Sequence, residues 1–231
     1  MDNRPIGVFD SGVGGLTVVN ALSKVLPNES IYYVGDTARV PYGNKSKSSI
    51  LKFSQQITDW LLKQNCKIIV IACNTASSLA LSYLKSNLST SIIGVIDPAI
   101  KHAQMKTKNK QIGVLGTRAT INSNIYSNRF KELDKKISVI SKACPLFVPL
   151  VEEGFISGSI PLSVAKHYLN DIRKTDVDTL ILGCTHYPLL ATIISNVLGP
   201  SITLIDSSLA TADKVKSMLE NNNLLANKNL S

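Results

Sequence analysis

Two cysteines stand at the same place in two similar stretches of the chain. Cys73 ends the run Lys-Ile-Ile-Val-Ile-Ala-Cys, and Cys184 ends the run Thr-Leu-Ile-Leu-Gly-Cys. Each run is short, apolar and rich in β-branched residues, which predicts a buried strand of a parallel sheet. A helix-compatible segment follows, so each thiol is expected where open α/β sheets bind ligands and where a helix dipole favours a thiolate. The matched pair predicts two acid/base groups that face one substrate.

The other two cysteines, Cys66 and Cys144, are interpreted as small buried hydrophobic residues. No Cys-x-x-Cys pair is present and the spacing does not resemble a secreted disulfide framework, so we expect no metal and a reducing cytoplasm. No signal-peptide pattern opens the sequence, and no apolar run approaches the roughly 18–20 residues that span a membrane. We therefore predict a cytoplasmic protein without a membrane partner.

The chain carries a formal net charge of +9 over 231 residues, of which 44% are hydrophobic, enough for a buried core. The densest basic cluster is Lys101, Lys106, Lys108 and Lys110, but aromatic residues are few and no nucleic-acid-binding motif appears. We interpret these lysines as a solvated face and predict no nucleic-acid partner. The positive charge would also attract a small anionic substrate.

Predicted strands and helices alternate along the chain, which is typical of an α/β fold with mainly parallel sheets flanked by helices. Strands are expected near residues 5–9, 31–34, 67–72, 92–96, 111–115, 137–140, 179–183 and 202–205. Helices are expected near residues 14–25, 46–64, 75–88, 98–107, 119–132, 159–173, 187–197 and 208–221.

The two halves of the chain also resemble each other. The segment that starts Pro5-Ile-Gly-Val is similar to the one that starts Gln111-Ile-Gly-Val, and each is followed by a cysteine strand. We predict two pseudo-symmetric α/β domains, residues 1–97 with 207–231 and residues 98–206, each holding one of the two strand-end thiols. The active site is expected in the cleft between them.

The first predicted turn, Asp10-Ser-Gly-Val-Gly-Gly15, is rich in glycine. Its spacing differs from the dinucleotide fingerprint Gly-x-Gly-x-x-Gly, so we expect no nicotinamide cofactor. Glycines allow a tight turn there, and amides at a helix start can hold a carboxylate. Asp10 is expected at the strand end, pointing into the cleft, although it could also only cap the helix that follows.

Seven segments, taken in order, make the chain similar to one known family. They are Ile6-Gly-Val-Phe-Asp-Ser-Gly-Val-Gly-Gly-Leu-Thr17, Tyr33-Val-Gly-Asp-Thr-Ala-Arg-Val-Pro-Tyr-Gly43, Ile71-Ala-Cys-Asn-Thr-Ala76, Gly94-Val-Ile-Asp-Pro98, Ile112-Gly-Val-Leu-Gly-Thr117, Ala143-Cys-Pro-Leu-Phe-Val-Pro-Leu-Val-Glu-Glu-Gly154 and Leu182-Gly-Cys-Thr-His-Tyr-Pro-Leu189. From residue 6 to about 210 the chain resembles bacterial glutamate racemases, of the cofactor-independent aspartate/glutamate racemase superfamily.

The resemblance implies an isomerase that interconverts L- and D-glutamate and supplies D-glutamate for peptidoglycan. It implies no cofactor, neither pyridoxal phosphate nor a metal, and it also admits a homodimer. One thiol would serve each face of the α-carbon, with Cys73 acting on the proton of the D-enantiomer and Cys184 on that of the L-enantiomer. A free thiol with a pKa of about 8.5 is a poor base at neutral pH, so the site must poise it.

Three further catalytic residues are implied by the same resemblance: Asp10 beside the first thiol, His186 two residues past the second, and Glu152. Glu153 is adjacent to Glu152 and is the alternative for that role. His186 could instead be an ordinary structural histidine.

The predicted substrate-binding residues offer hydroxyl and amide groups that suit the carboxylates of a dianionic amino acid. They are Asp10, Ser11, Pro41, Tyr42, Gly43, Asn74, Thr75, Thr117, Thr120, Thr185 and His186. The turn Pro41-Tyr42-Gly43 fits a loop that closes over substrate through its backbone amides. No arginine stands in these motifs to form a bidentate clamp, so helix N-termini would do that work.

Three alternatives stay open from the residues. An aspartate racemase or a related isomerase would use the same two thiols. A two-domain binding protein for anionic ligands would need no thiol chemistry, and its binding would survive replacement of both cysteines by serine. A redox protein would use the pair as a dithiol and show a disulfide-dependent activity.

Overall fold

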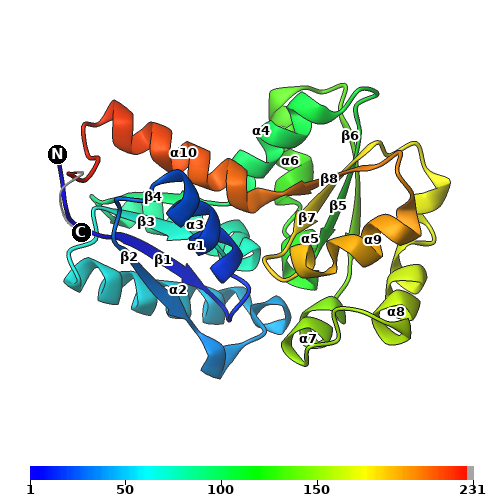
Figure 1. Cartoon of the computed structure of the whole chain (residues 1–231), viewed down its shortest axis with the longest axis horizontal. Helices are drawn as coiled ribbons and strands as arrows, with labels where there is room; N and C mark the ends of the chain where they lie inside the picture. The colour runs from blue at the N-terminus through cyan, green and yellow to red at the C-terminus, as the bar shows by residue number, and fades with distance from the viewer. Residues whose placement is uncertain (228–231) are drawn as a thin grey trace.

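Two four-stranded parallel sheets organise the computed structural model, which describes residues 1–227 (Figure 1). The first sheet has the order β2-β1-β3-β4, with β1 Ile6–Asp10, β2 Ile31–Gly35, β3 Ile68–Ile71 and β4 Ser91–Gly94. The second has the order β6-β5-β7-β8, with β5 Gln111–Gly116, β6 Ser138–Ala143, β7 Thr179–Gly183 and β8 Thr203–Asp206. The matching strand orders confirm the predicted pseudo-symmetric α/β fold, and all eight predicted strands are present.

The helices cover both faces of each sheet. They are α1 Leu16–Val25, α2 Lys47–Lys63, α3 Asn74–Asn87, α4 Ile96–Lys106, α5 Arg118–Asn122, α6 Ile125–Leu133, α7 Phe147–Glu152, α8 Ser159–Leu169, α9 Ala191–Leu198 and α10 Ser207–Asn221. Within the described residues, no helix combines the length and apolar character that a membrane crossing needs.

Three predicted helices are wrong in their extent. The one expected over 119–132 is two helices, α5 and α6, because Asn124 adopts a left-handed conformation (φ 56°) that asparagine tolerates and that breaks a helix. The one expected over 159–173 ends at Leu169, and a separate 3₁₀ turn follows. The one expected from residue 187 opens with a 3₁₀ turn, Tyr187–Leu190, before α9 begins. Helix α7 was not expected at all.

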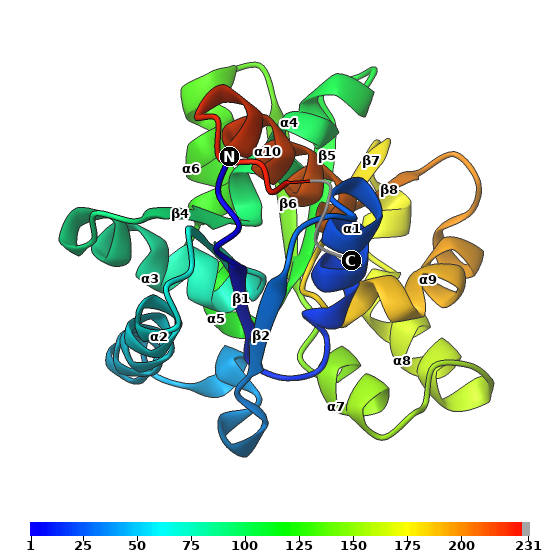
Figure 2. The same ribbon diagram turned by 60° about the vertical axis from the view of Figure 1, so that its left-hand side comes forward.

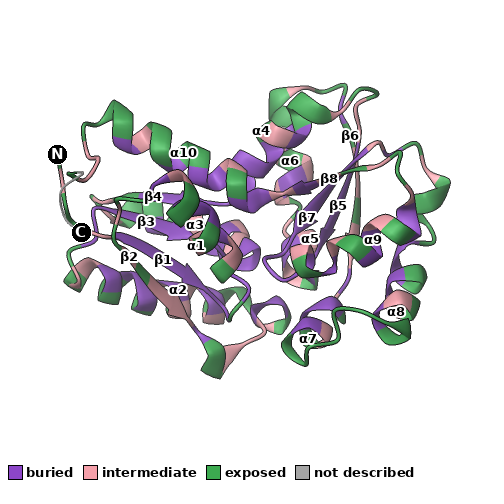
Figure 3. Ribbon diagram, in the orientation of Figure 1, coloured by how far each residue is buried: buried purple, intermediate pink, exposed green. Residues whose placement is uncertain are grey.

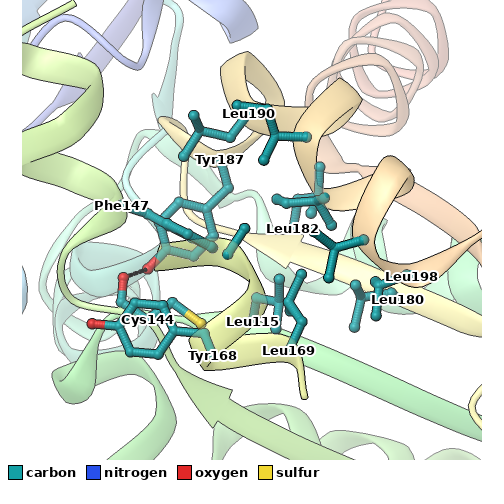
Figure 4. Close-up of a cluster of buried hydrophobic side chains, with 14 of the residues drawn as sticks. Leu115, Cys144, Phe147, Tyr168, Leu169, Leu180, Leu182, Tyr187, Leu190 and Leu198 are labelled. Atoms are coloured by element: carbon teal, nitrogen blue, oxygen red, sulfur yellow. Dashed lines mark hydrogen bonds between the residues drawn. The ribbon is translucent and has the colours of Figure 1, made fainter. Parts of the chain in front are cut away.

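The inner strands β1, β3, β5 and β7 are buried almost throughout, as a sheet covered by helices on both faces requires, whereas the edge strands β2 and β6 are only partly buried (Figure 3). On one face of the second sheet, a core cluster packs Leu115, Leu180 and Leu182 against helices α7, α8 and α9 (Figure 4). The aromatic rings of Phe147 and Tyr187 meet edge to face within it, with centroids 5.2 Å apart. This cluster fixes α7 against the strand that precedes Cys184.

Two helices connect the halves of the molecule. Helix α4 packs Ile96 and Ile100 against the second sheet, and α10 leaves β8 and packs Val215 and Leu219 against the first (Figures 1 and 2). The chain thus passes twice between the sheets, near residues 95 and 207. This packing is an argument for the predicted domain bounds, which stay a prediction and of which residues 228–231 lie outside the described part.

Candidate active site

The two strand-end thiols line one small cavity between the carboxyl ends of the two sheets. Cys73 follows β3 and caps α3, whereas Cys184 follows β7, and their residues are 5% and 7% exposed. The cavity has a volume of about 10 Å³, close to the room that one water molecule needs. The pairing of thiols from two similar sheets is therefore present in the fold, as the repeat predicted.

Cys73 sits among weak hydrogen-bonding partners. Its sulfur accepts from the backbone amide of Ala76 at 3.5 Å and lies 3.7 Å from the hydroxyl of Ser11. Burial raises the pKa of Cys73 to about 12, the negative charge of Asp10 adds to the rise, and these partners oppose it. This shift favours the protonated thiol at neutral pH.

Cys184 has a histidine beside it. Its sulfur lies 3.9 Å from Nδ1 of His186. Burial raises the pKa of Cys184 well above the usual range, the backbone amide of His186 opposes that rise, and the negative charges of Asp10 and of Cys73 in its thiolate form strengthen it. The charge of Asp10 raises the pKa of both thiols, and a thiolate at Cys73 would raise that of Cys184. The protonation states of the two thiols are therefore electrostatically linked.

Asp10 is held by the glycine turn that follows it. Its Oδ2 accepts from the backbone amides of Gly12 and Gly15 at 3.0 and 3.1 Å, and its Oδ1 accepts from the hydroxyl of Thr185 at 3.2 Å. A Cβ on Gly15 would lie 2.4 Å from the Asp10 Cβ, so only glycine allows this approach. Burial raises the pKa of Asp10, while His186 and the three hydrogen bonds oppose the rise. The sequence predicted that amides in this glycine turn could hold a carboxylate, and the carboxylate they hold is the side chain of Asp10.

His186 connects Cys184 to a carboxylate. Its Nε2 lies 2.5 Å from Oε1 of Glu152, the last residue of α7, and the ring is 1% exposed. Glu152 and the adjacent alternative, Glu153, are both exposed, so the contact with His186 is what distinguishes Glu152. A Cβ on Gly14 would lie 2.6 Å from the His186 ring, so the glycine turn of one half packs directly on this histidine of the other. A Glu–His–thiol arrangement can hold or pass a proton.

A group of hydroxyls joins the halves on the other side of the cavity. Thr75 Oγ1 lies 2.9 Å from Thr117 Oγ1 and 3.2 Å from Thr120 Oγ1, and the last two are 3.0 Å apart. Thr117 caps α5, and Thr75 lies in the first turn of α3. The N-termini of α3 and α5 therefore face each other here, and helix N-termini are where the sequence predicted that substrate carboxylates bind.

The turn that contains Tyr42 and Gly43 closes one side of the cavity. The hydroxyl of Tyr42 donates to Asp36 at 2.5 Å, and Asp36 also pairs with Arg39 at 2.8 Å. Gly43 lies so close to Thr117 that a Cβ would come within 2.5 Å of it. These contacts hold the backbone of the turn over the thiols.

Most of the predicted site residues lie at this cavity. Its lining consists of Ser11, Pro41, Tyr42, Gly43, Cys73, Asn74, Thr75, Thr117, Val148, Cys184, Thr185 and His186. Asp10, Thr120 and Glu152 stand behind the lining and reach it through Thr185, Thr75 and His186. In the described part of the chain, no three His, Cys, Asp or Glu side chains are placed to hold a metal ion.

A larger cavity, about 690 Å³, lies elsewhere, against α4, α6 and α10. It contains neither thiol, and its walls mix apolar side chains with charges of both signs. The chemistry therefore belongs to the small cavity.

Known proteins resemble the chain over nearly its whole length. Residues 15–215 match the family described as Asp/Glu/hydantoin racemase. A protein of Sulfurihydrogenibium named glutamate racemase is 51% identical over 93% of this chain and 82% of its own. The chain belongs to the Asp/Glu/hydantoin racemase family.

Solved structures of the family superpose closely on the fold. A glutamate racemase isoform of Bacillus anthracis has a TM-score of 0.96 at 41% identity, over 98% of this chain and 85% of that one. The enzyme of Francisella tularensis, solved in complex with D-glutamate, has a TM-score of 0.93 at 44% identity, over 99% and 85%. An aspartate racemase of Picrophilus torridus, at 18% identity, shares only the fold.

Two residues near the site carried no chemical signal in the sequence. Val148 lines the cavity from α7, and Tyr126 donates its hydroxyl hydrogen bond to Asn74 from α6. Val148 is an apolar residue inside a family segment, so only the resemblance pointed to its neighbourhood. The contact of Tyr126 joins different halves of the racemase fold, which no local pattern reveals.

Proposed function

We propose that the chain is a glutamate racemase, an isomerase that interconverts L- and D-glutamate by proton transfer at the α-carbon. The observation that carries the proposal is the pair of thiols, Cys73 and Cys184, that reach one cavity from two different sheets. The names of the relatives support glutamate as the substrate.

In the proposed reaction one sulfur is a thiolate and the other a thiol. The thiolate takes the α-proton, so an S–H bond forms as the C–H bond breaks, and the electron pair stays on the α-carbon. The other thiol then gives its proton to the opposite face, and the sulfurs exchange states. Following the resemblance, Cys73 takes the proton of the D-enantiomer and Cys184 that of the L-enantiomer.

In this proposal the remaining residues bind the charged groups of the substrate, orient the catalytic side chains and influence the charge on the two sulfurs. Hydroxyl and amide donors around the cavity bind the substrate carboxylates and stabilise the negative charge that develops at the α-carbon. His186 assists Cys184 at a separation of 3.9 Å, and Glu152 orients the ring. Asp10 acts on both sulfurs electrostatically.

The setting of the activity is also proposed. All four cysteines are free thiols, a state that a reducing cytoplasm preserves. There the product would serve peptidoglycan synthesis. A homodimer stays a prediction.

Circular dichroism of D-glutamate incubated with the purified protein, with no added cofactor, tests the proposal. We expect the signal to decay to zero, because the two enantiomers have equal free energies in solution, and L-glutamate to decay likewise. Activity that appears only with pyridoxal phosphate would contradict the proposal. So would turnover of aspartate without turnover of glutamate, which would favour the aspartate racemase alternative.

A further inference from the structure

Among the described residues, Asn74 is the only residue with a side-chain amide in the lining of the cavity that holds both thiols. It is 2% exposed, and its Oδ1 accepts a hydrogen bond from the hydroxyl of Tyr126 at 2.8 Å. Its Nδ2 is buried and has no hydrogen-bond partner in the described part of the protein. A buried amide donor without a partner is costly unless a ligand satisfies it.

The partner of that amide oxygen comes from the other half of the molecule. Tyr126 lies in the first turn of α6, 2% exposed, with its ring in the core that Ile96, Ile112 and Phe130 form against the second sheet. Its hydroxyl also lies beside Gly183, next to the second thiol, since a Cβ on that glycine would be 3.4 Å from it. Burial raises the pKa of Tyr126, so the phenol keeps its proton at neutral pH and can donate it.

A donor at this place decides which way the amide faces. The side chain of asparagine has an acceptor at one end and two donors at the other. In this structure the Tyr126 hydroxyl donates to the Asn74 oxygen, so the NH₂ group is the end of the amide that Tyr126 leaves without a partner. We propose that Tyr126 is a positioning residue that orients the Asn74 amide so that its NH₂ group meets a substrate carboxylate. The inference rests on the proposed function, since it assumes an amino-acid substrate.

The hydrogen bond from Tyr126 to Asn74 joins the two halves of the molecule and therefore depends on how they pack together. Asn74 belongs to α3 on the first sheet and Tyr126 to α6 on the second. Separation of the halves would break the bond and free the amide to rotate. The carboxylate site is therefore complete only when the halves are together.

Tyr126→Phe tests the inference because it removes the hydroxyl and keeps the ring. Without the donor, the amide can turn its oxygen toward the carboxylate. We expect KM for both enantiomers of glutamate to rise about tenfold, the effect of one hydrogen bond to a charged group. We expect kcat to change by less than about threefold, since the contact is made equally before and during reaction.

A double-mutant cycle separates positioning from general damage. Asn74→Ala should raise KM at least as much, and adding Tyr126→Phe to it should change KM by less than about twofold, because Tyr126 acts through Asn74. Tyr168→Phe is the matched control. It removes another buried hydroxyl, one that accepts from the backbone of Leu146 at 3.2 Å, and it should leave KM unchanged.

Two results overturn the inference: an unchanged KM in Tyr126→Phe, or the same rise in KM with and without Asn74. Should Tyr126→Phe fail to fold, Asn74→Asp carries the test. That variant keeps an acceptor for Tyr126 but has no amide donor, and an unchanged KM would refute the proposed contact between the Asn74 amide and a substrate carboxylate.

Wild-type activity separates this inference from the proposed function. If the wild type acts on aspartate only, the proposed function fails and the same cycle is run on aspartate. If it acts on neither, both fail.

Discussion

The sulfur atoms of Cys73 and Cys184 lie where their charged forms are disfavoured. Both are buried, and both feel the carboxylate of Asp10. A substrate changes this balance, because its ammonium group brings a positive charge to a cavity that holds a carboxylate and two thiols, and an opposite charge within a few ångströms lowers a thiol pKa. Poising of the thiolate is therefore expected to accompany substrate binding.

The raised pKa of Cys73 can be measured without substrate. In a variant that keeps only this cysteine, alkylation by iodoacetamide should speed up about tenfold per pH unit from pH 7 to 10, because the thiolate fraction grows tenfold per unit below the pKa. The pKa of about 12 predicts no plateau in that range. Free cysteine, the control, should level off near pH 9. A plateau for the protein below pH 9 would contradict the burial argument.

The two thiols are distinguished by removing them one at a time. Cys73→Ser and Cys184→Ser should each lose racemisation by at least about 10²-fold, because a hydroxyl is a poor base and every turnover needs both faces. Elimination of chloride from β-chloroalanine needs only one proton abstraction, so it should survive. The Cys73 variant should retain it for the L-analogue and the Cys184 variant for the D-analogue, as chromatographic assay of pyruvate would show.

Cys66→Ser is the control for these variants, since Cys66 is buried but lies outside the cavity lining. It should racemise normally. If both catalytic variants preferred the same enantiomer, the two-sided site would be wrong; swapped preferences would refute only the assignment of faces.

At the scale of elements, the strands were predictable from the sequence and the short helix α7 was not. Apolar runs such as Ile68–Ile71 and Thr179–Gly183 leave little choice but a buried strand, and the cysteine after each is then placed by the sheet edge. Helix α7, Phe147–Glu152, has only 6 residues and contains a proline, so it shows no helical period. Tertiary packing of Phe147 forms it instead.

Phe147→Ala should test how α7 is held. The ring is fully buried and meets Tyr168 and Tyr187 edge to face, at 5.3 and 5.2 Å. Its loss should reduce the free energy of unfolding by about 3–5 kcal/mol, measured by urea denaturation. It should also lower activity by loosening Glu152 from His186. Leu146→Ala, at a residue that is 51% exposed, should change stability by at most about 0.5 kcal/mol. Equal effects would show that Phe147 is not the anchor.

At the scale of the whole molecule, the cavity is too small for an amino acid. Its volume is about 10 Å³, room for about one water molecule, so the halves or the turn at Tyr42 must move apart to admit substrate. The internal repeat predicted that two thiols would meet, because equivalent strands end at equivalent edges. It could not predict which side chains meet across the halves, as Thr75 meets Thr117, because that depends on how α4 and α10 set one sheet against the other.

The meeting of two halves predicts a solvent-isotope pattern that a one-base enzyme would not give. A base from each half acts on opposite faces of the α-carbon, so the proton removed stays on one sulfur and the proton delivered comes from the other. In D₂O, both thiols exchange with solvent between turnovers, so the product should carry deuterium at the α-carbon from the start. Substrate recovered at low conversion should stay largely protiated, which proton NMR or mass spectrometry of the separated enantiomers would show. A single base that swings between faces labels both pools alike. Equal early labelling of substrate and product in both directions would therefore contradict the two-thiol site.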